Sequence, residues 1–323
     1  MTHAINPLDP NAFQIHRATV RDGVELAYIR EGVGGVPLLL MNGWPGTKRI
    51  YYKNIQPLAE AGFEVVVADN RGWGDSPVPA DRAQHADAAN VSRDMHALME
   101  SLGHERWVLA GYDFGSMASQ DMAIRFPDQI IRQVVWNGFS PAVYDEYHAA
   151  GIPSDQFEEI LEISDHMSIQ ADRDALVASL DTPEKRREFI KGFYLGRTWR
   201  EGGPVIPLAA PGAFDDASAA FQAEPFMDAD VLHATLSFYE TSAKPELLSE
   251  VPMLFEKNTK TETLILCGME DKVINGPQMC RRAKIGYAKL VGPFMIPDAG
   301  HFVSWEQPEI FNSALISFCR DLL

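Results

Sequence analysis

Short, continuous runs of apolar residues recur along the first half of the chain, separated by segments with a different pattern. The runs are Val36–Met41, Phe63–Ala68, Trp107–Ala110 and Ile130–Trp136. Runs of this length and continuity are typical of strands buried on both faces of a parallel sheet. The intervening segments 50–61, 87–102 and 114–126 carry apolar residues at helical spacing. This alternation predicts an α/β fold, with a mostly parallel sheet flanked by helices on both faces.

The pattern begins with a hairpin and is interrupted once. Residues 16–30 hold Asp22-Gly23 between two β-rich runs, which is a hairpin signature. From 141 to 251 the strand pattern is missing, and helical stretches are interrupted by Gly and Pro. It then returns with strands at 263–267 and 290–296 and helices at 278–284 and 304–322. We therefore expect a core of residues 1–140 and 252–323, with a helical cap inserted at 141–251.

Composition narrows the class of protein. The 323 residues are 46% hydrophobic and 23% charged, with a formal net charge of −17. Such a charge repels phosphate, which argues against nucleic acid and anionic membrane surfaces as partners. The three cysteines form no CxxC pair, the first residues resemble no signal peptide, and no apolar run is long enough to span a membrane. These features predict a cytoplasmic protein; its oligomeric state, a homodimer included, stays open.

The strongest local signal is Gly111-Tyr112-Asp113-Phe114-Gly115, between a predicted strand and a predicted helix. It has the form of a nucleophile elbow, with Asp where Ser is usual. Such a sharp turn needs small residues two positions either side of the nucleophile. The helix N-terminus beneath it favours an ionised carboxylate. The alternative interpretation is a plain turn in which Asp113 caps the helix.

Two later loops supply partners for this aspartate. The strand at 263–267 leads into Cys267-Gly268-Met269-Glu270-Asp271, and the last strand leads into Pro297-Asp298-Ala299-Gly300-His301. The chain order is nucleophile, acid, base, as in α/β hydrolases. His301 is the predicted base and Asp271 the predicted acid, with Glu270 and Asp298 as alternatives for the acid.

With these motifs the chain resembles the α/β-hydrolase superfamily, and in particular its branch with an aspartate nucleophile. That branch includes epoxide hydrolases, haloalkane dehalogenases and fluoroacetate dehalogenases. Further support comes from Asn42-Gly43-Trp44-Pro45-Gly46, from the Asp69–Ser76 segment and from Gly300-His301-Phe302. Asn42 stands where the family usually has the His that helps to hold the oxyanion loop. The likeness covers residues 20–140 and 260–323 well and the insertion loosely.

An aspartate nucleophile restricts the chemistry. Attack by Asp113 on an alkyl carbon gives an ester, which keeps a carbonyl group for a second attack by water. His301, oriented by Asp271, would activate that water. The backbone N–H groups of Trp44 and Phe114 would stabilise the oxyanion. The chemistry needs no cofactor, and the sequence has no H-E-x-x-H motif or zinc spacing.

The leaving group is predicted from what surrounds the nucleophile. Phe114 replaces the Trp that clamps halide in haloalkane dehalogenases, and Ser116 and Met117 stand where fluoroacetate dehalogenases carry arginines. The stretch 236–240 resembles the cap helix that bears a proton-donating tyrosine in epoxide hydrolases. It makes Tyr239 the candidate donor. The stretch 163–170, where a second tyrosine is expected, offers only His166.

We therefore expect an enzyme that opens epoxides, acting on small, mostly apolar molecules. One alternative is a dehalogenase that uses the same three residues. The other is a non-catalytic ligand-binding protein on a hydrolase scaffold.

Overall fold

An eight-stranded sheet forms the centre of the computed structural model, which describes residues 5–153, 166–199, 202–248 and 253–323. Its spatial order is β1 (His16–Thr19), β2 (Glu25–Glu31), β4 (Phe63–Ala68), β3 (Val36–Met41), β5 (Trp107–Tyr112), β6 (Ile130–Gly138), β9 (Glu262–Gly268) and β10 (Leu290–Ile296). In this spatial order, each strand from β4 onward pairs in parallel with the next one, up to β10. Strand β2 pairs antiparallel with both β1 and β4. The predicted α/β class and the hairpin at 16–30 are thereby confirmed.

The strand bounds follow the apolar runs closely. Three predicted strands, β3, β4 and β10, have the expected ends. Strand β5 continues two residues beyond the apolar run, because Gly111 and Tyr112 still pair with Val135 and Trp136 of β6. The sheet therefore extends to the residue immediately before Asp113.

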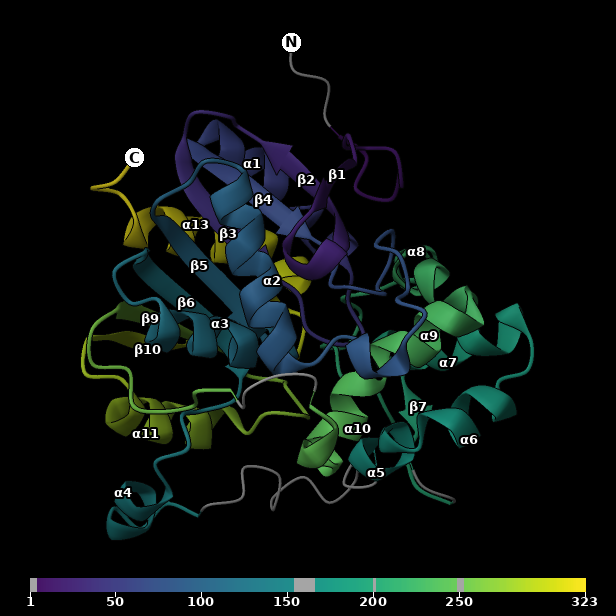
Figure 1. Cartoon of the computed structure of the whole chain (residues 1–323). Helices are drawn as coiled ribbons and strands as arrows, with labels where there is room; N and C mark the ends of the chain where they lie inside the picture. The colour runs from purple at the N-terminus through teal and green to yellow at the C-terminus, as the bar shows by residue number, and fades with distance from the viewer. Residues whose placement is uncertain (1–4, 154–165, 200–201, 249–252) are drawn as a thin grey trace.

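Helices cover both faces of the sheet. In Figure 1, α2 (Ala88–Ser101) and α3 (Asp113–Arg125) lie in front of it, and α1 (Ile55–Glu60) and α13 (Pro308–Phe318) lie behind. Helix α11 (Gly276–Gly286) packs against β9 and β10. The helix predicted from residue 50 starts only at Ile55, after a 3-10 turn over Lys48–Tyr51.

The terminal helix is also shorter than predicted. It is broken into α12 (Val303–Glu306) and α13, because Pro308 lacks an N–H group and begins a new helix.

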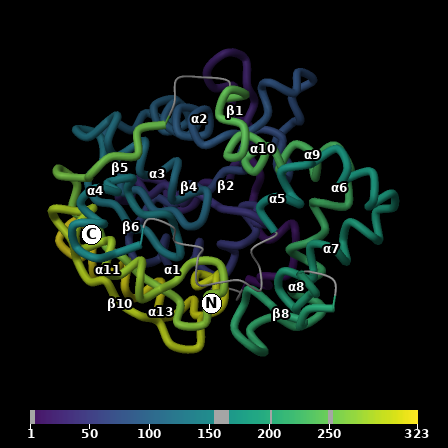
Figure 2. Tube along the Cα trace, turned by 90° about the horizontal axis from the view of Figure 1, so that it is seen from below, coloured from purple at the N-terminus to yellow at the C-terminus, as the bar shows by residue number. Residues whose placement is uncertain are grey.

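The described residues of the segment between β6 and β9 contribute no strand to the main sheet. Its helices are α4 (Tyr144–Ala149), α5 (His166–Ala171), α6 (Arg173–Ser179), α7 (Pro183–Leu195), α8 (Asp216–Ala223), α9 (Ala229–Thr235) and α10 (Ser237–Ala243). Helices α5 to α9 gather on one side of the molecule in both views, whereas α4 lies near α11 (Figures 1 and 2). A small ladder of β7 (Arg197–Thr198) and β8 (Val205–Ile206) was not predicted, because two-residue strands leave no periodic pattern.

The order of the strands locates the functional edge of the sheet. Strand β3 lies between β4 and β5. The chain therefore passes from β3 to β4 on one side and then crosses to β5 on the other side. Ligands bind at such a switch point, outside the carboxyl ends of the strands. The loop after β3 carries Trp44, and the residue after β5 is Asp113.

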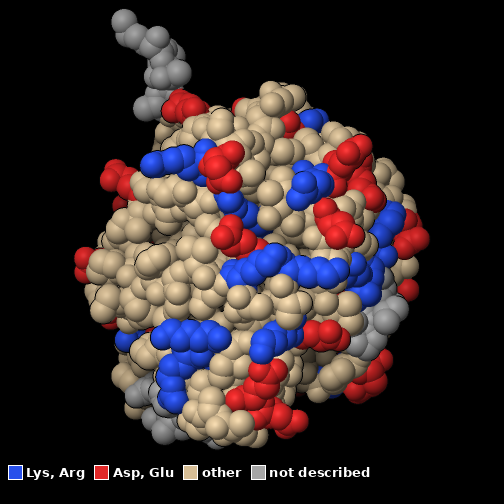
Figure 3. All heavy atoms as spheres, turned by 90° about the vertical axis from the view of Figure 1, so that its left-hand side faces the viewer, with Lys and Arg blue, Asp and Glu red and all other residues tan. Residues whose placement is uncertain are grey.

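On the face drawn in Figure 3, basic side chains lie among acidic ones. None of the helices described has the length and hydrophobicity that crossing a bilayer requires.

Candidate active site

Asp113 occupies a sharp turn between β5 and α3. Its φ is 50°, in the left-handed region that few non-glycine residues adopt. The turn depends on the flanking glycines, since a Cβ at Gly111 would lie 2.6 Å from the Gly115 carbonyl oxygen. A Cβ at Gly43 would collide with the Asp113 side chain itself. The carboxylate is therefore held at the strand end, in contact with the loop that follows β3.

His301 joins two carboxylates from different loops. Its Nε2 lies 3.5 Å from Asp113 Oδ2, and its Nδ1 lies 3.1 Å from Asp271 Oδ2. All three side chains are buried. Asp271 Oδ1 also accepts the N–H groups of Val273 and Ile274, at 2.7 and 3.2 Å, which fixes the carboxylate. The two alternatives for the acid, Glu270 and Asp298, are exposed, and only Asp271 faces His301.

The two carboxylates decide the charge of His301. Burial lowers the pKa of its imidazole, but Asp271 and Asp113 outweigh that effect and raise the pKa to about 10. At neutral pH the ring is therefore an imidazolium between two carboxylates.

The loop after β3 contacts the other oxygen of the nucleophile. The Trp44 N–H donates a hydrogen bond of 2.8 Å to Asp113 Oδ1. Asn42 Nδ2 donates to the Gly46 carbonyl oxygen at 2.9 Å, and the Tyr194 hydroxyl donates to the Pro45 carbonyl oxygen. Asn42 thus holds the loop although it replaces the expected His. The role of the Phe114 N–H as a second oxyanion donor stays a prediction.

Tyr239 stands over this centre on α10. Its ring makes edge contacts with Phe114 and Trp44, at centroid distances of 4.9 and 5.3 Å. Burial raises the pKa of its hydroxyl well above the usual value, and the nearby Asp113 carboxylate raises it further. The ring centroids of His166 and Tyr239 lie 6.0 Å apart, so α5 and α10 bring both predicted donors together. Residues 163–165 of the stretch searched for a second tyrosine lie outside the described residues.

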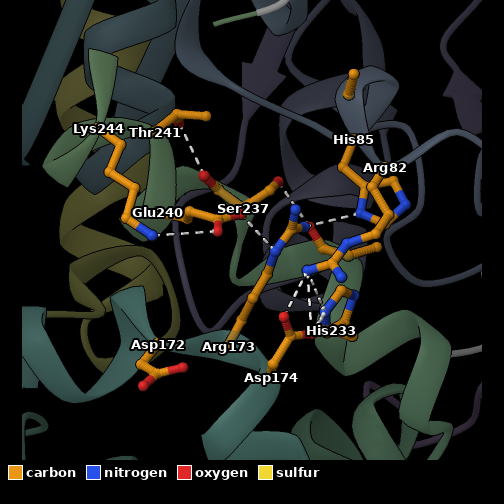
Figure 4. Close-up of polar contacts among 12 residues, drawn as sticks. Arg82, His85, Asp172, Arg173, Asp174, His233, Ser237, Glu240, Thr241 and Lys244 are labelled. Carbon is orange, nitrogen blue, oxygen red and sulfur yellow. Dashed lines mark hydrogen bonds and ion pairs between the residues drawn. The ribbon is translucent and has the colours of Figure 1, made fainter. Parts of the chain in front are cut away.

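Polar contacts tie α10 to the core through the loop before α2 (Figure 4). Arg173 of α6 forms an ion pair with Glu240, at 2.6 Å, and its NH1 lies 2.9 Å from His85 Nδ1. The Ser237 hydroxyl donates to the Ala86 carbonyl oxygen. Ser237 and Glu240, which lie on either side of Tyr239, therefore anchor α10 at two points.

Two polar residues that the sequence did not single out, one buried and one partly buried, hold the loops of the candidate site. Asn137, with φ 39°, donates from Nδ2 to the Gly300 carbonyl oxygen at 2.5 Å and accepts the Gly268 N–H at 2.7 Å. Glu306 accepts the N–H groups of Gly300, Phe302 and Ala210 at 2.6 to 2.7 Å. In the sequence, Asn137 is recognisable only as a polar residue at the end of a strand. Glu306 is recognisable only as a polar residue shortly after His301.

Comparison with known proteins shows the family of this chain. A family profile described as "alpha/beta hydrolase fold" matches residues 36–308. The chain belongs to the α/β hydrolase fold family. Mouse "Epoxide hydrolase 4" is 26% identical to this α/β hydrolase over 308 residues, which cover 93% of this chain and 77% of the relative. An "Epoxide hydrolase" from Caballeronia sordidicola is 24% identical, covering 93% and 92% of the two chains.

Solved structures show the same fold. The structure titled "Epoxide hydrolase CorEH without ligand" superposes with a TM-score of 0.75 and 20% identity, covering 96% of this α/β hydrolase and all of that chain.

Proposed function

We propose that this α/β hydrolase opens small, mostly apolar epoxides to diols through an ester on Asp113. The observation that carries the proposal is the environment of the Asp113 carboxylate. One oxygen accepts the Trp44 N–H, the other faces His301, and the Tyr239 ring lies over the same centre. The names of the relatives support the choice of substrate class.

In the first step an Asp113 oxygen attacks one epoxide carbon, and the C–O bond of the ring breaks. The Tyr239 hydroxyl transfers its proton to the oxygen that leaves, which gives a hydroxyalkyl ester and a tyrosinate. Esterification removes the negative charge of Asp113. This loss makes the Tyr239 hydroxyl more acidic, since that charge had raised its pKa.

The same loss of charge prepares His301 for the second step. With Asp113 esterified, one of the two carboxylates that hold the imidazolium is gone, and its proton can pass to the tyrosinate. The neutral ring then removes a proton from water, which attacks the ester carbonyl carbon. The tetrahedral oxyanion is stabilised by the N–H groups of Trp44 and Phe114. Its collapse releases the diol and restores the Asp113 carboxylate and the imidazolium.

The inserted segment supplies the apolar wall of the site. The Phe238 ring stacks on Phe114 at 4.8 Å, and Phe193 meets Trp44 edge-on at 4.8 Å. We propose that residues 141–251 act as a cap, which encloses an apolar substrate between these rings and Asp113. Enclosure strengthens the electrostatic contacts at the reacting atoms by excluding water.

A product screen tests the proposal. The wild type is incubated with an aryl epoxide such as styrene oxide and, separately, with chloro- and bromoalkanes. We expect diol from the epoxide, and a loss of turnover of about 10⁴-fold or more in Asp113→Ala. Asp128→Ala, at an exposed site between α3 and β6, is the matched control and should keep full activity. Halide release without diol would contradict the epoxide assignment, and normal turnover by Asp113→Ala would remove the nucleophile.

A further inference from the structure

Four sulfur atoms gather at the edge of the sheet, between β9, β10 and α11. Cys267 Sγ lies 3.6 Å from Met279 Sδ and 3.6 Å from Cys280 Sγ. Cys280 Sγ lies 3.6 Å from Met295 Sδ. Each thiol therefore faces the other thiol and one thioether. The proposed epoxide reaction uses none of these four side chains.

The spacing between neighbouring sulfur atoms is close to that of ligands around one metal ion. A tetrahedral ion with metal–sulfur bonds of about 2.3 Å holds its ligand sulfurs about 3.8 Å apart. The three separations, which join neighbouring sulfurs in the order Met279, Cys267, Cys280 and Met295, fall just below this value. Gly276, at the start of α11, makes room for the cluster, because a Cβ there would lie 3.0 Å from Met295 Cε.

The kind of ligand selects the kind of ion. Thiolate and thioether sulfurs favour soft cations such as Cu(I), whereas Mg²⁺ and Ca²⁺ prefer oxygen. Among the described residues there is no cluster of three or more His, Cys, Asp or Glu side chains suited to a harder ion. The two methionines matter here, since thioethers add ligands for a soft ion but contribute nothing to a disulfide.

The cluster is closed on one side and accessible on the other. Cys267 and Met279 are buried, while Cys280 and Met295 are only partly covered. An ion could therefore enter past Cys280 and Met295. The third cysteine, Cys319, is buried at the end of α13, in a different part of the fold, so it provides an internal control.

We propose that Cys267, Cys280, Met279 and Met295 form a binding site for one soft monovalent cation, with Cu(I) as the natural candidate. The ion forms bonds to the two cysteine sulfurs as thiolates and to the two thioethers. Each cysteine releases its proton to solvent, and no group is oxidised or reduced. This site is separate from the proposed reaction and does not depend on it.

Titration of the full, reduced chain with Cu(I) tests the site. Cu(I) is added without oxygen in competition with a Cu(I)-specific chelator, and Ag(I) serves as a redox-inert probe. We expect one ion per chain, coordinated by sulfur alone in X-ray absorption spectra. Cys280→Ser, at the partly exposed position, should abolish this binding, whereas Cys319→Ser should bind like the wild type.

The methionines provide variants that preserve the apolar packing. Met295→Leu and Met279→Leu should each weaken Cu(I) binding by at least about tenfold, the loss that removal even of an outer-shell partner typically causes. Unchanged affinity in Cys280→Ser, or in both methionine variants, would overturn the site. So would loss of binding in Cys319→Ser.

Discussion

The charge of one histidine links the two proposed chemical steps. In the proposed mechanism, His301 is an imidazolium in the resting site because two carboxylates face it, and it becomes a base only when Asp113 is esterified. The base is thus unavailable before the first step and available after it. For this exchange, the His301 ring must contact Asp271 through Nδ1 and Asp113 through Nε2, on its two opposite sides.

The raised pKa of His301 predicts how stability depends on pH. The pKa is about 10 in the folded chain and about 6.5 when unfolded, so folding favours the protonated ring. This stabilisation is complete below about pH 6.5 and is lost as the pH rises through about 10. The unfolding free energy of the wild type, measured with urea, should fall more steeply across this range than that of His301→Gln. Equal slopes in the two proteins would show that the imidazolium is not stabilised by its neighbours.

Tyr239→Phe separates the two steps. An epoxide oxygen leaves as a strongly basic alkoxide, so removing the hydroxyl should slow ester formation by about 10²–10⁴-fold. The rate is measured in a single turnover by rapid quenching, and hydrolysis of the ester already formed should change much less. Tyr144→Phe, at an exposed position on α4, is the control and should behave like the wild type. An unchanged rate of ester formation in Tyr239→Phe would transfer the role to another donor, such as His166.

At the scale of elements, four loops at the carboxyl ends of parallel strands build the site. The sequence predicted the strands well, because strands such as β4 and β5 are buried along their whole length and appear as continuous apolar runs. It also predicted that the residues after β3, β5, β9 and β10 meet, because these ends share one edge. It missed the hydrogen bonds that hold the loops, since Asn137 and Glu306 contact residues that local patterning does not connect.

Glu306→Gln tests whether one carboxylate positions the His301 loop. The carboxylate accepts three N–H groups, from Gly300 and Phe302 on either side of His301 and from Ala210 of the inserted segment. The amide can keep only part of this arrangement and loses its charge, and hydrogen bonds to charged groups contribute about 1.5–3 kcal/mol. We expect a lower kcat at nearly unchanged KM and a lower unfolding free energy.

The conservative variant and a neighbour provide controls for this prediction. Glu306→Asp should recover part of kcat, because it keeps the charge. Glu309→Gln, at an exposed site on α13, should leave kcat and stability unchanged. If kcat in Glu306→Gln equals that of the wild type, Glu306 does not position the loop.

At the scale of the whole molecule, the sheet and the inserted helices form the candidate site together. The sheet edge supplies Asp113, Asp271 and His301, and α10 brings Tyr239 over them from the inserted segment. The sequence predicted the insertion from the loss of the strand pattern. It could not predict how α10 is anchored, because the contacts of Arg173 with His85 and Glu240 depend on tertiary packing.

The ester on Asp113 is the central claim, and a single turnover in water labelled with heavy oxygen tests it most directly. With enzyme in excess over epoxide, water attacks the ester carbonyl carbon and not the substrate. The first diol should therefore contain no label, and one labelled oxygen should be found in the peptide that contains Asp113 by mass spectrometry. A labelled diol with an unlabelled Asp113 would show that water attacks the epoxide directly, and it would contradict the account.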